Sequence, residues 1–384
     1  MTTTNNNEHK KLNVPNLRFP EFQGEWEEST IGEMFDLYSG NTPSRLNKKH
    51  FKGTVNWISS GELKEHYIYS SKEQISEEAA KSLKLLPVGT FVIAIYGLEA
   101  DGVRGTGSIT QEPSTISQAC MSFIPKGVIE NEFLYSWYKK HGNVIGIRYA
   151  QGTKQQNLSY DILEGFKIAY PCTKEQKKLN KFITFLDERI ATQNKIIDKL
   201  QTLIKGLRVR LVQIEKGNIV HLNEIASIYQ PQTISSTELT EDGFWVYGAN
   251  GIIGKYKDYN HKTEQICITC RGNTCGMVNY TKPMSWITGN AMVINTDDYQ
   301  DKVHKRYLYH YLSAYNFNSI ISGSGQPQIV RTPLELLKVT LPTILEQEQK
   351  AMFLDEIQGK IEIYNNILNL YLQQKQYLLR QMFI

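Results

Sequence analysis

The chain has 384 residues, of which 40% are hydrophobic and 21% are charged, and these proportions are ordinary for a soluble protein. This length is enough for two or three domains with hydrophobic cores. Because we find no run of about 18 apolar residues and no signal-peptide pattern, we expect a cytoplasmic protein without a membrane span. The five cysteines, an odd number without an export signal, indicate reduced thiols rather than a disulfide framework.

The net charge of +4 is not spread evenly along the chain. Residues 152–216 carry 13 basic and 7 acidic side chains, whereas the other 30 basic and 32 acidic side chains nearly cancel. Bulk charge therefore does not by itself indicate binding of nucleic acid. Two stretches, 37–61 and 243–257, contain basic residues and no acid. A solvated loop is the alternative interpretation of each of these patches.

A repeated dipeptide shows that the chain is built twice. Glu175-Gln176 and Glu346-Gln347 lie 171 residues apart, and each follows a proline by four residues. The same offset relates Gly152, Gln155, Leu163, Glu164, Lys167, Phe182 and Ile190 to Gly323, Gln326, Leu334, Glu335, Lys338, Phe353 and Ile361. Offsets of 175 and 172 align Tyr96-Gly97 with Arg271-Gly272 and Gln118-Ala119 with Asn290-Ala291. A fixed period of this kind indicates two copies of one supersecondary unit.

Each dipeptide begins a pattern that is typical of a long helix. Thr173 with Gln176, and Thr343 with Glu346, have the spacing of a capping box. Two apolar seams with heptad spacing follow: Ile183, Leu186, Ile190, Gln193, Ile197, Leu200, Ile204, Leu207, Leu211 and Ile214, then Leu354, Ile357, Ile361, Tyr364, Leu368, Tyr371, Lys375, Leu378 and Met382. Two matching seams predict a coiled coil of helices about 60 Å long. We expect the stem of Lys375 to reach solvent near a helix end.

The connections between these elements predict an antiparallel pair, because the second globular part then begins where the first helix ends. The expected fold is α/β (α+β), with two similar globular domains joined by the long antiparallel two-helix coiled coil as a spacer. The predicted segments are an N-terminal extension (1–24), domain 1 (25–151), spacer helix 1 (152–216), domain 2 (217–322) and spacer helix 2 (323–384). Within the domains we expect strands over 53–58, 91–96, 243–248 and 266–270, and helices over 76–85, 131–141 and 304–312.

Signatures of catalysis and metal binding are missing from the sequence. We find no phosphate-binding loop, no glycine-rich loop for S-adenosylmethionine and no Asn-Pro-Pro-Tyr tetrapeptide of amino-methyltransferases. Cys267, Cys270 and Cys275 include a Cys-x-x-Cys spacing, but residues three apart on a strand point to opposite faces. We therefore predict structural cysteines, no metal site and no catalytic residue.

Two similar modules held a fixed distance apart suit a linear target in two parts. Residues that read base edges are Arg, Lys, Asn, Gln, Ser and Thr on loops, and Lys and Arg contact phosphates. The candidates for binding DNA are Arg45, Lys48, Lys49, Lys52, Tyr96, Arg104, Thr106 and Gln118 in the first domain, and Tyr247, Asn250, Lys255, Tyr256, Arg271, Asn273 and Asn290 in the second. Solvated surface is the alternative for each residue.

The chain resembles the specificity subunit of type I restriction-modification enzymes. The resemblance rests on the two Pro-x-x-x-Glu-Gln motifs, on the segments that begin at Gly152 and Gly323, and on Val14-Pro-Asn-Leu-Arg-Phe-Pro-Glu-Phe. It implies two target recognition domains that read the halves of an interrupted site in double-stranded DNA. It also implies helical regions, marked by Glu175, Gln176, Glu346 and Gln347, that dock two methyltransferase subunits.

The same resemblance assigns the chemistry to partners. Two restriction subunits would complete a complex that cuts unmethylated DNA, while S-adenosylmethionine, ATP and magnesium would bind the partners, with no cofactor on this chain. The family's Arg-Gly pair is present at Arg271-Gly272 but is Tyr96-Gly97 in the first copy. Two other functions stay open at this point: an adaptor with two protein-binding heads on a coiled-coil rod, and an enzyme that acts alone.

Overall fold

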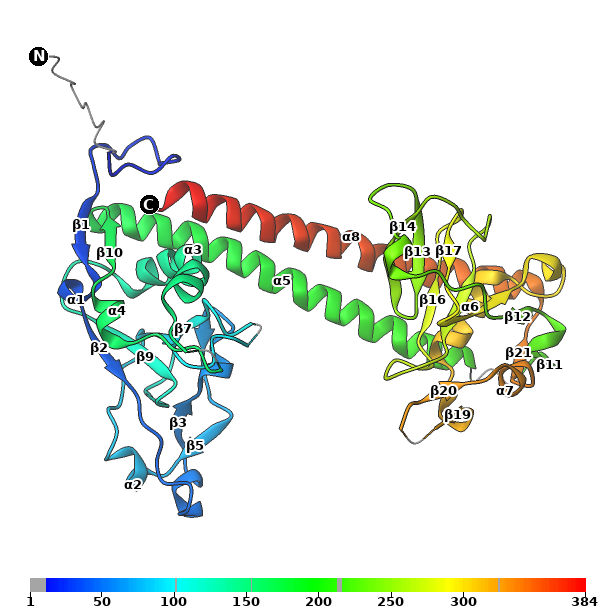
Figure 1. The fold of residues 1–384 in the computed structure, drawn as a ribbon, viewed down its shortest axis with the longest axis horizontal. Coiled ribbons are helices and arrows are strands. Elements are labelled where there is room, and N and C mark those ends of the chain that lie inside the picture. Colours follow the sequence, from blue (N-terminus) through cyan, green and yellow to red (C-terminus); the bar gives the residue numbers. More distant parts are fainter. Residues whose placement is uncertain (1–11, 101, 153, 213–215, 324) are drawn as a thin grey trace, which may run out of the picture. The chain divides into compact units, whose positions relative to one another are not determined.

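The computed structural model describes residues 12–100, 102–152, 154–212, 216–323 and 325–384 (Figure 1). Most of the predicted N-terminal extension is described, but residues 1–11 and Ile214 of the first seam lie outside the described residues. The chain divides into two compact units. Unit 1 is Met1–Gln193 with Ile367–Ile384, and unit 2 is Asn194–Asn366.

Unit 1 is built on a five-stranded sheet, and its predicted central strand is confirmed. The order is β2 (Phe35–Ser39), β9 (Cys120–Pro125), β6 (Phe91–Ala94), β7 (Gly107–Thr110) and β4 (Tyr67–Ile68). Neighbouring strands are antiparallel except β4 and β7, which are parallel. All four side chains of β6 are buried, as expected of a strand covered on both faces.

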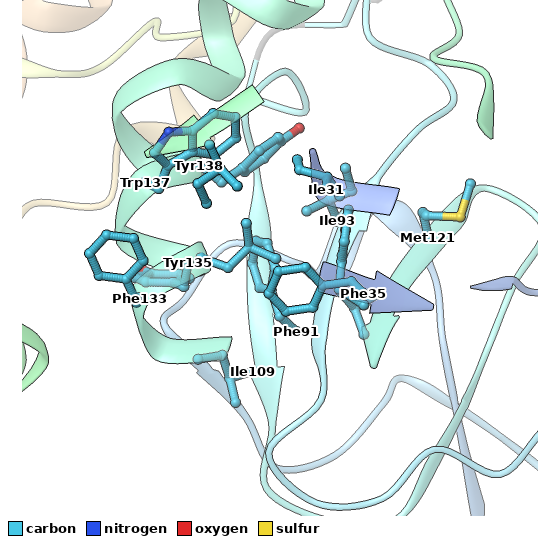
Figure 2. Packing of buried hydrophobic residues seen from close by; sticks show 14 of the residues in the cluster. Ile31, Phe35, Phe91, Ile93, Ile109, Met121, Phe133, Tyr135, Trp137 and Tyr138 are labelled. Atoms are coloured by element: carbon cyan, nitrogen blue, oxygen red, sulfur yellow. The ribbon is translucent and has the colours of Figure 1, made fainter. Parts of the chain in front are cut away.

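Helix α3 (Asn131–Tyr149) covers one face of this sheet and supplies the aromatic core of unit 1. Figure 2 shows Phe133, Tyr135, Trp137 and Tyr138 of this helix together with Phe91, Ile93, Ile109 and Met121 of the sheet. The ring of Phe91 lies 5.9 Å from Tyr135 and 5.8 Å from Tyr138, both in edge-to-face contact. Such pairs add to the free energy gained by burying the rings. The helix predicted over 131–141 is therefore confirmed, and it continues to Tyr149.

We call the part of each unit outside the two long helices its head. A second, smaller sheet completes the head of unit 1. It has the order β5 (Glu73–Ile75), β3 (Val55–Ile58) and β8 (Ser114–Ile116), with the short helices η1 (Lys48–Phe51), η2 (Ser60–Glu62) and α2 (Glu77–Ala80). The helix predicted over 76–85 is only one turn long. Leu86 exchanges main-chain hydrogen bonds with Ser114, which draws the chain into the sheet edge and ends the helical stretch.

Unit 2 repeats the smaller sheet and the first four strands of the larger one. Its larger sheet has the order β12 (Ser227–Tyr229), β18 (Ala291–Asn295), β15 (Ile266–Thr269) and β16 (Val278–Tyr280), and α6 (Lys305–Ala314) packs on β16. Its smaller sheet has the order β14 (Gly251–Tyr256), β13 (Phe244–Gly248) and β17 (Trp286–Ile287). In the strands that both units share the directions match, with one parallel pair, β13 and β17, in the smaller sheet. Among the described residues no strand of the larger sheet of unit 2 corresponds to β4. The predicted duplication is thus present in the fold.

Each unit also has a two-stranded ladder where its head meets a long helix. In unit 1, β1 (Glu27–Thr30) pairs with β10 (Lys167–Tyr170), and in unit 2, β11 (Asn218–His221) pairs with β21 (Lys338–Leu341). The remaining short elements are α1 (Ile31–Met34), α4 (Tyr160–Glu164), η3 (Leu222–Glu224), η4 (Ser236–Glu238), η5 (Asp297–Tyr299), η6 (Phe317–Ser319), β19 (Ile321–Ser322), β20 (Gln328–Ile329) and α7 (Arg331–Glu335).

The two long helices are α5 (Thr173–Val212) and α8 (Ile344–Met382). In unit 1, Ile183 and Leu186 of α5 share a buried cluster with Leu378 of α8. In unit 2, Ile204 of α5 shares a cluster with Ile357 of α8. In each unit the beginning of one helix therefore packs with the end of the other. A continuous coiled coil that joins the units stays a prediction.

The prediction that Lys375 reaches solvent is wrong. Its ammonium group forms an ion pair with Asp187 of α5, and both side chains are mostly buried within unit 1. The seam therefore contains a charged residue because a carboxylate on the facing helix neutralises it.

Capping differs between the two long helices. The capping box of Thr343 and Glu346 is confirmed, since the Thr343 hydroxyl and main-chain nitrogen donate to the Glu346 carboxylate at 2.8 and 3.0 Å. The box at Thr173 is wrong, because Thr173 is already helical and the residue that follows Pro171 is Cys172. Glu175 consequently lacks a capping hydroxyl.

Candidate nucleic-acid interface

The ends of the central strands are built alike in both units. Leu158 N donates to Ile95 O at 2.9 Å, and Ile329 N donates to Cys270 O at 3.0 Å. Next to these bonds, Tyr96 forms a bridge with Asn157 and Arg271 forms one with Gln328. The aligned residues Tyr96 and Arg271 therefore occupy equivalent positions beyond β6 and β15.

In unit 2 the structure brings several predicted residues to the end of β15. The Asn290 carbonyl accepts a hydrogen bond from Cys270 N at 3.3 Å, and the Ala249 carbonyl accepts from the Thr269 hydroxyl and from Asn279 Nδ2. These bonds fix the turns around this strand end. We call its exposed side chains the unit 2 rim: Gln230, Asn250, Arg271, Asn273 and Asn290.

Gln230 is a rim residue that the sequence did not indicate. Its Nε2 donates to the Gly289 carbonyl at 3.1 Å and lies 3.1 Å from the Cys270 sulfur. Its position directly after β12 could have identified Gln230 as a candidate, because strands β12 and β15 both flank β18 in this sheet.

Three candidates of unit 2 are engaged in contacts within the unit and are not part of the rim. Tyr247 is only 6% exposed and its hydroxyl accepts from Lys282 N at 3.0 Å, so the prediction that Tyr247 reads bases is wrong. Lys255 lies 3.6 Å from Asp242 and also contacts the ring of Trp245. Tyr256 packs edge to face against Trp286 at 5.1 Å.

In unit 1, Tyr96 and Gln118 lie near the equivalent strand end. Tyr96 is 38% exposed, and the hydrogen bond from Ile95 N to Ala119 O at 2.9 Å holds the exposed Gln118 beside β6. Arg104 and Thr106 are half-buried and form hydrogen bonds within unit 1. Arg104 Nη2 donates to Gln156 Oε1 at 3.1 Å, and the Thr106 hydroxyl donates to the Val103 carbonyl at 2.6 Å.

Three lysines of the predicted basic patch lie on one exposed turn. We call Lys48, Lys49 and Lys52 the basic turn. Asn47 caps it by accepting from Lys49 N at 3.1 Å, and η1 packs on β5. Within the described part of the chain these lysines form no ion pair. Arg45 differs, because both its terminal nitrogens donate to Glu73 and its guanidinium lies over Phe51.

The glutamines of the repeated dipeptides join each long helix to its head. Gln176 Oε1 accepts from Glu130 N at 3.0 Å, and its Nε2 donates to the carbonyls of Val128 and Pro171. Gln347 makes the same three bonds, with His304 N at 2.9 Å and with the carbonyls of Lys302 and Pro342. Glu130 and His304 are the N-cap residues of α3 and α6.

The glutamates of the dipeptides differ from one another. Glu175 is buried and receives two hydrogen bonds from Arg18, at 2.8 and 2.7 Å, whereas Glu346 is exposed and serves its own capping box. Glu175, Gln176 and Gln347 are therefore committed to contacts within their own units. Docking of partners at these helix beginnings stays a prediction, and these three buried side chains offer no surface for it.

Two cysteines of the Cys-x-x-Cys spacing, Cys267 on β15 and Cys270 directly after it, enter different buried clusters, as the strand argument predicted. Cys267 packs with Tyr247 in one buried cluster and Cys270 with Met292 in another, and burial raises the pKa of the Cys267 thiol. Among the described residues no group of three or more His, Cys, Asp and Glu side chains could hold a metal ion. No helix in the described ranges is long and apolar enough to cross a membrane.

The duplicated architecture agrees with a known family. The family model of the type I restriction modification DNA specificity domain matches residues 23–202 and 215–370, so the chain belongs to this family. The resemblance found in the sequence is thereby confirmed.

Relatives and solved structures agree with this assignment. The specificity subunit of the type I restriction enzyme EcoprrI from Escherichia coli is 24% identical over 352 residues, which is 85% of this chain and 86% of the relative. That of EcoR124I/EcoR124II, also from Escherichia coli, is 30% identical over 57% of this chain and 52% of the relative. The S subunit of a type I restriction-modification system from M. genitalium has the same fold, with a TM-score of 0.67, 16% identity and coverage of 97% and 99% of the two chains.

Proposed function

We propose that this chain is the non-catalytic subunit that gives a type I restriction-modification complex its DNA sequence specificity. Each head would read one half of an interrupted site. The observation that supports this most strongly is the equivalent placement of Tyr96 and Arg271 on the same framework of strand-end hydrogen bonds. A shared framework with different side chains at the reading position is what two different half-sites require.

The unit 2 rim has the chemistry to read purines. The two parallel donors of the Arg271 guanidinium match O6 and N7 of guanine, and the amides of Asn250, Asn273 and Asn290 match N6 and N7 of adenine. These side chains are exposed and so keep their hydrogen-bonding capacity for DNA. In unit 1 the corresponding readers are Tyr96 and Gln118, with the basic turn contacting phosphates.

Two methyltransferase subunits would dock on exposed apolar faces of the long helices, one on each unit. In unit 1, the exposed Phe185 (52%) lies in a groove of about 710 Å³. Its apolar lining is Phe182, Phe185, Leu186 and Tyr371, and its polar lining is Glu188, Arg189, Thr192, Gln193 and Gln374. In unit 2, Phe353 is 54% exposed and aligns with Phe182 at the repeat offset. Exposed aromatic side chains on a packed helix are typical of protein interfaces. Restriction subunits would complete the cytoplasmic complex.

The long helices would act as the spacer. If α5 and α8 form one continuous antiparallel coiled coil, their length fixes the gap between the half-sites. Deleting one heptad from both helices should change this gap and leave both half-sites intact. An altered half-site with an unaltered gap would count against the spacer role.

The chemistry would reside on the partners, which would carry S-adenosylmethionine, ATP and magnesium. The test uses the full chain with and without methyltransferase subunits. We expect salt-dependent binding to a duplex and methylation at one interrupted sequence only in the assembly. Lack of DNA binding in every assembly would favour the adaptor alternative. Methyl transfer or cleavage by the purified chain alone would favour an enzyme that acts by itself.

A further inference from the structure

A histidine of unit 1 lies in a built site that DNA reading does not explain. The side chain of His66 is 8% exposed. Its ring is sandwiched between Tyr67 and Tyr135, with centroids 4.1 and 4.0 Å away and interplanar angles of 9° and 2°. Stacking on both faces leaves only the ring edge available for polar contacts.

Both nitrogens on that edge face carboxylates. His66 Nε2 lies 2.8 Å from Glu132 Oε2 of α3, and Nδ1 lies 3.1 Å from Asp187 Oδ2 of α5. Ionised carboxylates only accept hydrogen bonds, so both nitrogens must carry a proton for both bonds to form. The geometry therefore specifies the imidazolium cation rather than a neutral tautomer.

The other charges near the ring are of both signs, and the two lysines among them oppose a cation there. Asp187 also pairs with Lys375 of α8, Lys139 of α3 lies over the Tyr135 ring at 5.2 Å, and Glu65 adds a carboxylate from the neighbouring loop. Burial lowers the pKa of Lys139 to about 8. Burial also lowers the pKa of His66, but the bonds to Asp187 and Glu132 outweigh this effect and raise it above 6.5.

The position of His66 links the helices to the part of the head that carries the basic turn. Its carbonyl accepts from Ile109 N at 2.8 Å on the larger sheet. The segment that contains it joins β3 to β5, the strand on which η1 packs. Contacts of His66 to α3 and α5 therefore hold the connection between the two sheets of unit 1, and α8 joins only through the pair of Lys375 with Asp187.

Unit 2 uses a neutral histidine at the corresponding interface. His310 Nδ1 accepts from Arg208 Nε at 3.0 Å, and Nε2 lies 2.8 Å from Asp355 Oδ1, so one protonated nitrogen satisfies both contacts. Burial lowers the pKa of His310. Arg306, which occupies the position of Glu132 in the repeat, supplies the charge that pairs with Asp355.

We propose that His66 is a positioning residue whose imidazolium form clamps the connection between the two sheets of unit 1 to α3 and α5. On this account, recognition of the half-site read by unit 1 is linked to one proton, whereas recognition by unit 2 is not. The functional part of this inference rests on the proposed function. A raised pKa means that the clamp is complete below pH 6.5 and is lost as the pH rises through the pKa of the folded protein.

The test compares the full chain with the variant His66→Gln, which keeps a planar polar side chain but no titrating charge. The matched control is His310→Gln. Nitrogen NMR of histidine-labelled protein should show one imidazolium above pH 6.5 that is missing from His66→Gln. In thermal unfolding, the wild type and His310→Gln should lose stability as the pH rises from 6 to 9. His66→Gln should not show this loss. If His66→Gln does not fold, Glu132→Gln is compared with the wild type in the same measurements.

A second measurement uses the chain assembled with methyltransferase subunits and duplexes altered in one half-site. Discrimination at the half-site of unit 1 should fall with rising pH by at most about tenfold per pH unit, because one proton is involved. The half-site of unit 2 should show no such change. A neutral His66 at pH 6.5, or equal pH profiles of wild type and His66→Gln, would overturn the clamp. Failure to bind DNA while the proton linkage persists would instead refute the proposed function alone.

Discussion

The side-chain oxygen of Gln176 accepts a hydrogen bond from the main-chain nitrogen of Glu130 at 3.0 Å, which ties the beginning of α5 to the beginning of α3. Gln347 repeats this bond with His304 at 2.9 Å. One amide thus satisfies a main-chain donor at the beginning of the head helix and two carbonyls. The repeated dipeptide is explained by this junction, since glutamine has both a donor and an acceptor at the required reach.

Replacing Gln347 with alanine should lower the free energy of unfolding by about 2–4 kcal/mol, because one main-chain donor and two carbonyls lose a buried partner. Urea denaturation of the full chain measures this loss. The matched control is Glu346→Ala, which removes an exposed capping carboxylate and should have a smaller effect. Equal losses in the two variants would show that the junction is not formed in solution.

Replacing Arg18 with alanine should destabilise unit 1 by about 2–3 kcal/mol, because the buried Glu175 carboxylate loses its partner. The loss is below that of a fully buried pair, since Arg18 reaches solvent. The exposed pair of Lys167 and Glu28 provides the control, and Lys167→Ala should leave stability unchanged. Hydrogen exchange at the beginning of α5 would reveal the change; unaltered exchange there in the Arg18 variant would refute it.

Acid should weaken unit 2 through Asp355. Burial opposes ionisation of this carboxyl group, but His310 and Arg306 outweigh it and lower its pKa from 3.8 to about 2. A lowered pKa contributes stability above pH 3.8 that is lost as the pH falls toward 2. After allowance for partial exposure this amounts to about 1–2 kcal/mol at pH 7. Asp355→Asn should abolish this part of the acid dependence in denaturation curves, whereas the exposed Asp258→Asn should retain it.

Within the assembled complex, Arg271→Ala should cost about 1–3 kcal/mol of binding free energy and relax the choice of base at one position. Lys49→Ala should instead weaken binding to all duplexes equally and reduce the salt slope by about 0.9. Titrations with duplexes substituted base by base separate the two effects. A uniform loss with Arg271→Ala would mean that this residue contacts phosphate only.

Replacing Phe185 with aspartate should abolish docking of one methyltransferase subunit and leave folding intact, since this side chain is 52% exposed. Analytical ultracentrifugation of the mixed subunits would show a complex with one methyltransferase fewer. The exposed Tyr160, which lies on α4, provides the control variant Tyr160→Asp. Full assembly of the Phe185 variant would exclude this face as the docking surface.

The sequence predicted the duplication and the long helices because heptads and fixed offsets are properties of the chain itself. It predicted the cap of α5 wrongly because Cys172 stands where the second copy has Thr343. It could not reveal the bond between Arg18 and Glu175, which lie 157 residues apart. Exposure decides whether Tyr247 can read a base, and this depends on how β13 packs, which spacing alone does not encode.

Each head is proposed to read its own half-site. Exchanging residues 217–322 for those of another family member, followed by mapping of methylated positions across a genome, tests it most directly. We predict that one half-site changes while the other half-site and the gap between them stay the same. A change in both half-sites, or in neither, would contradict the account.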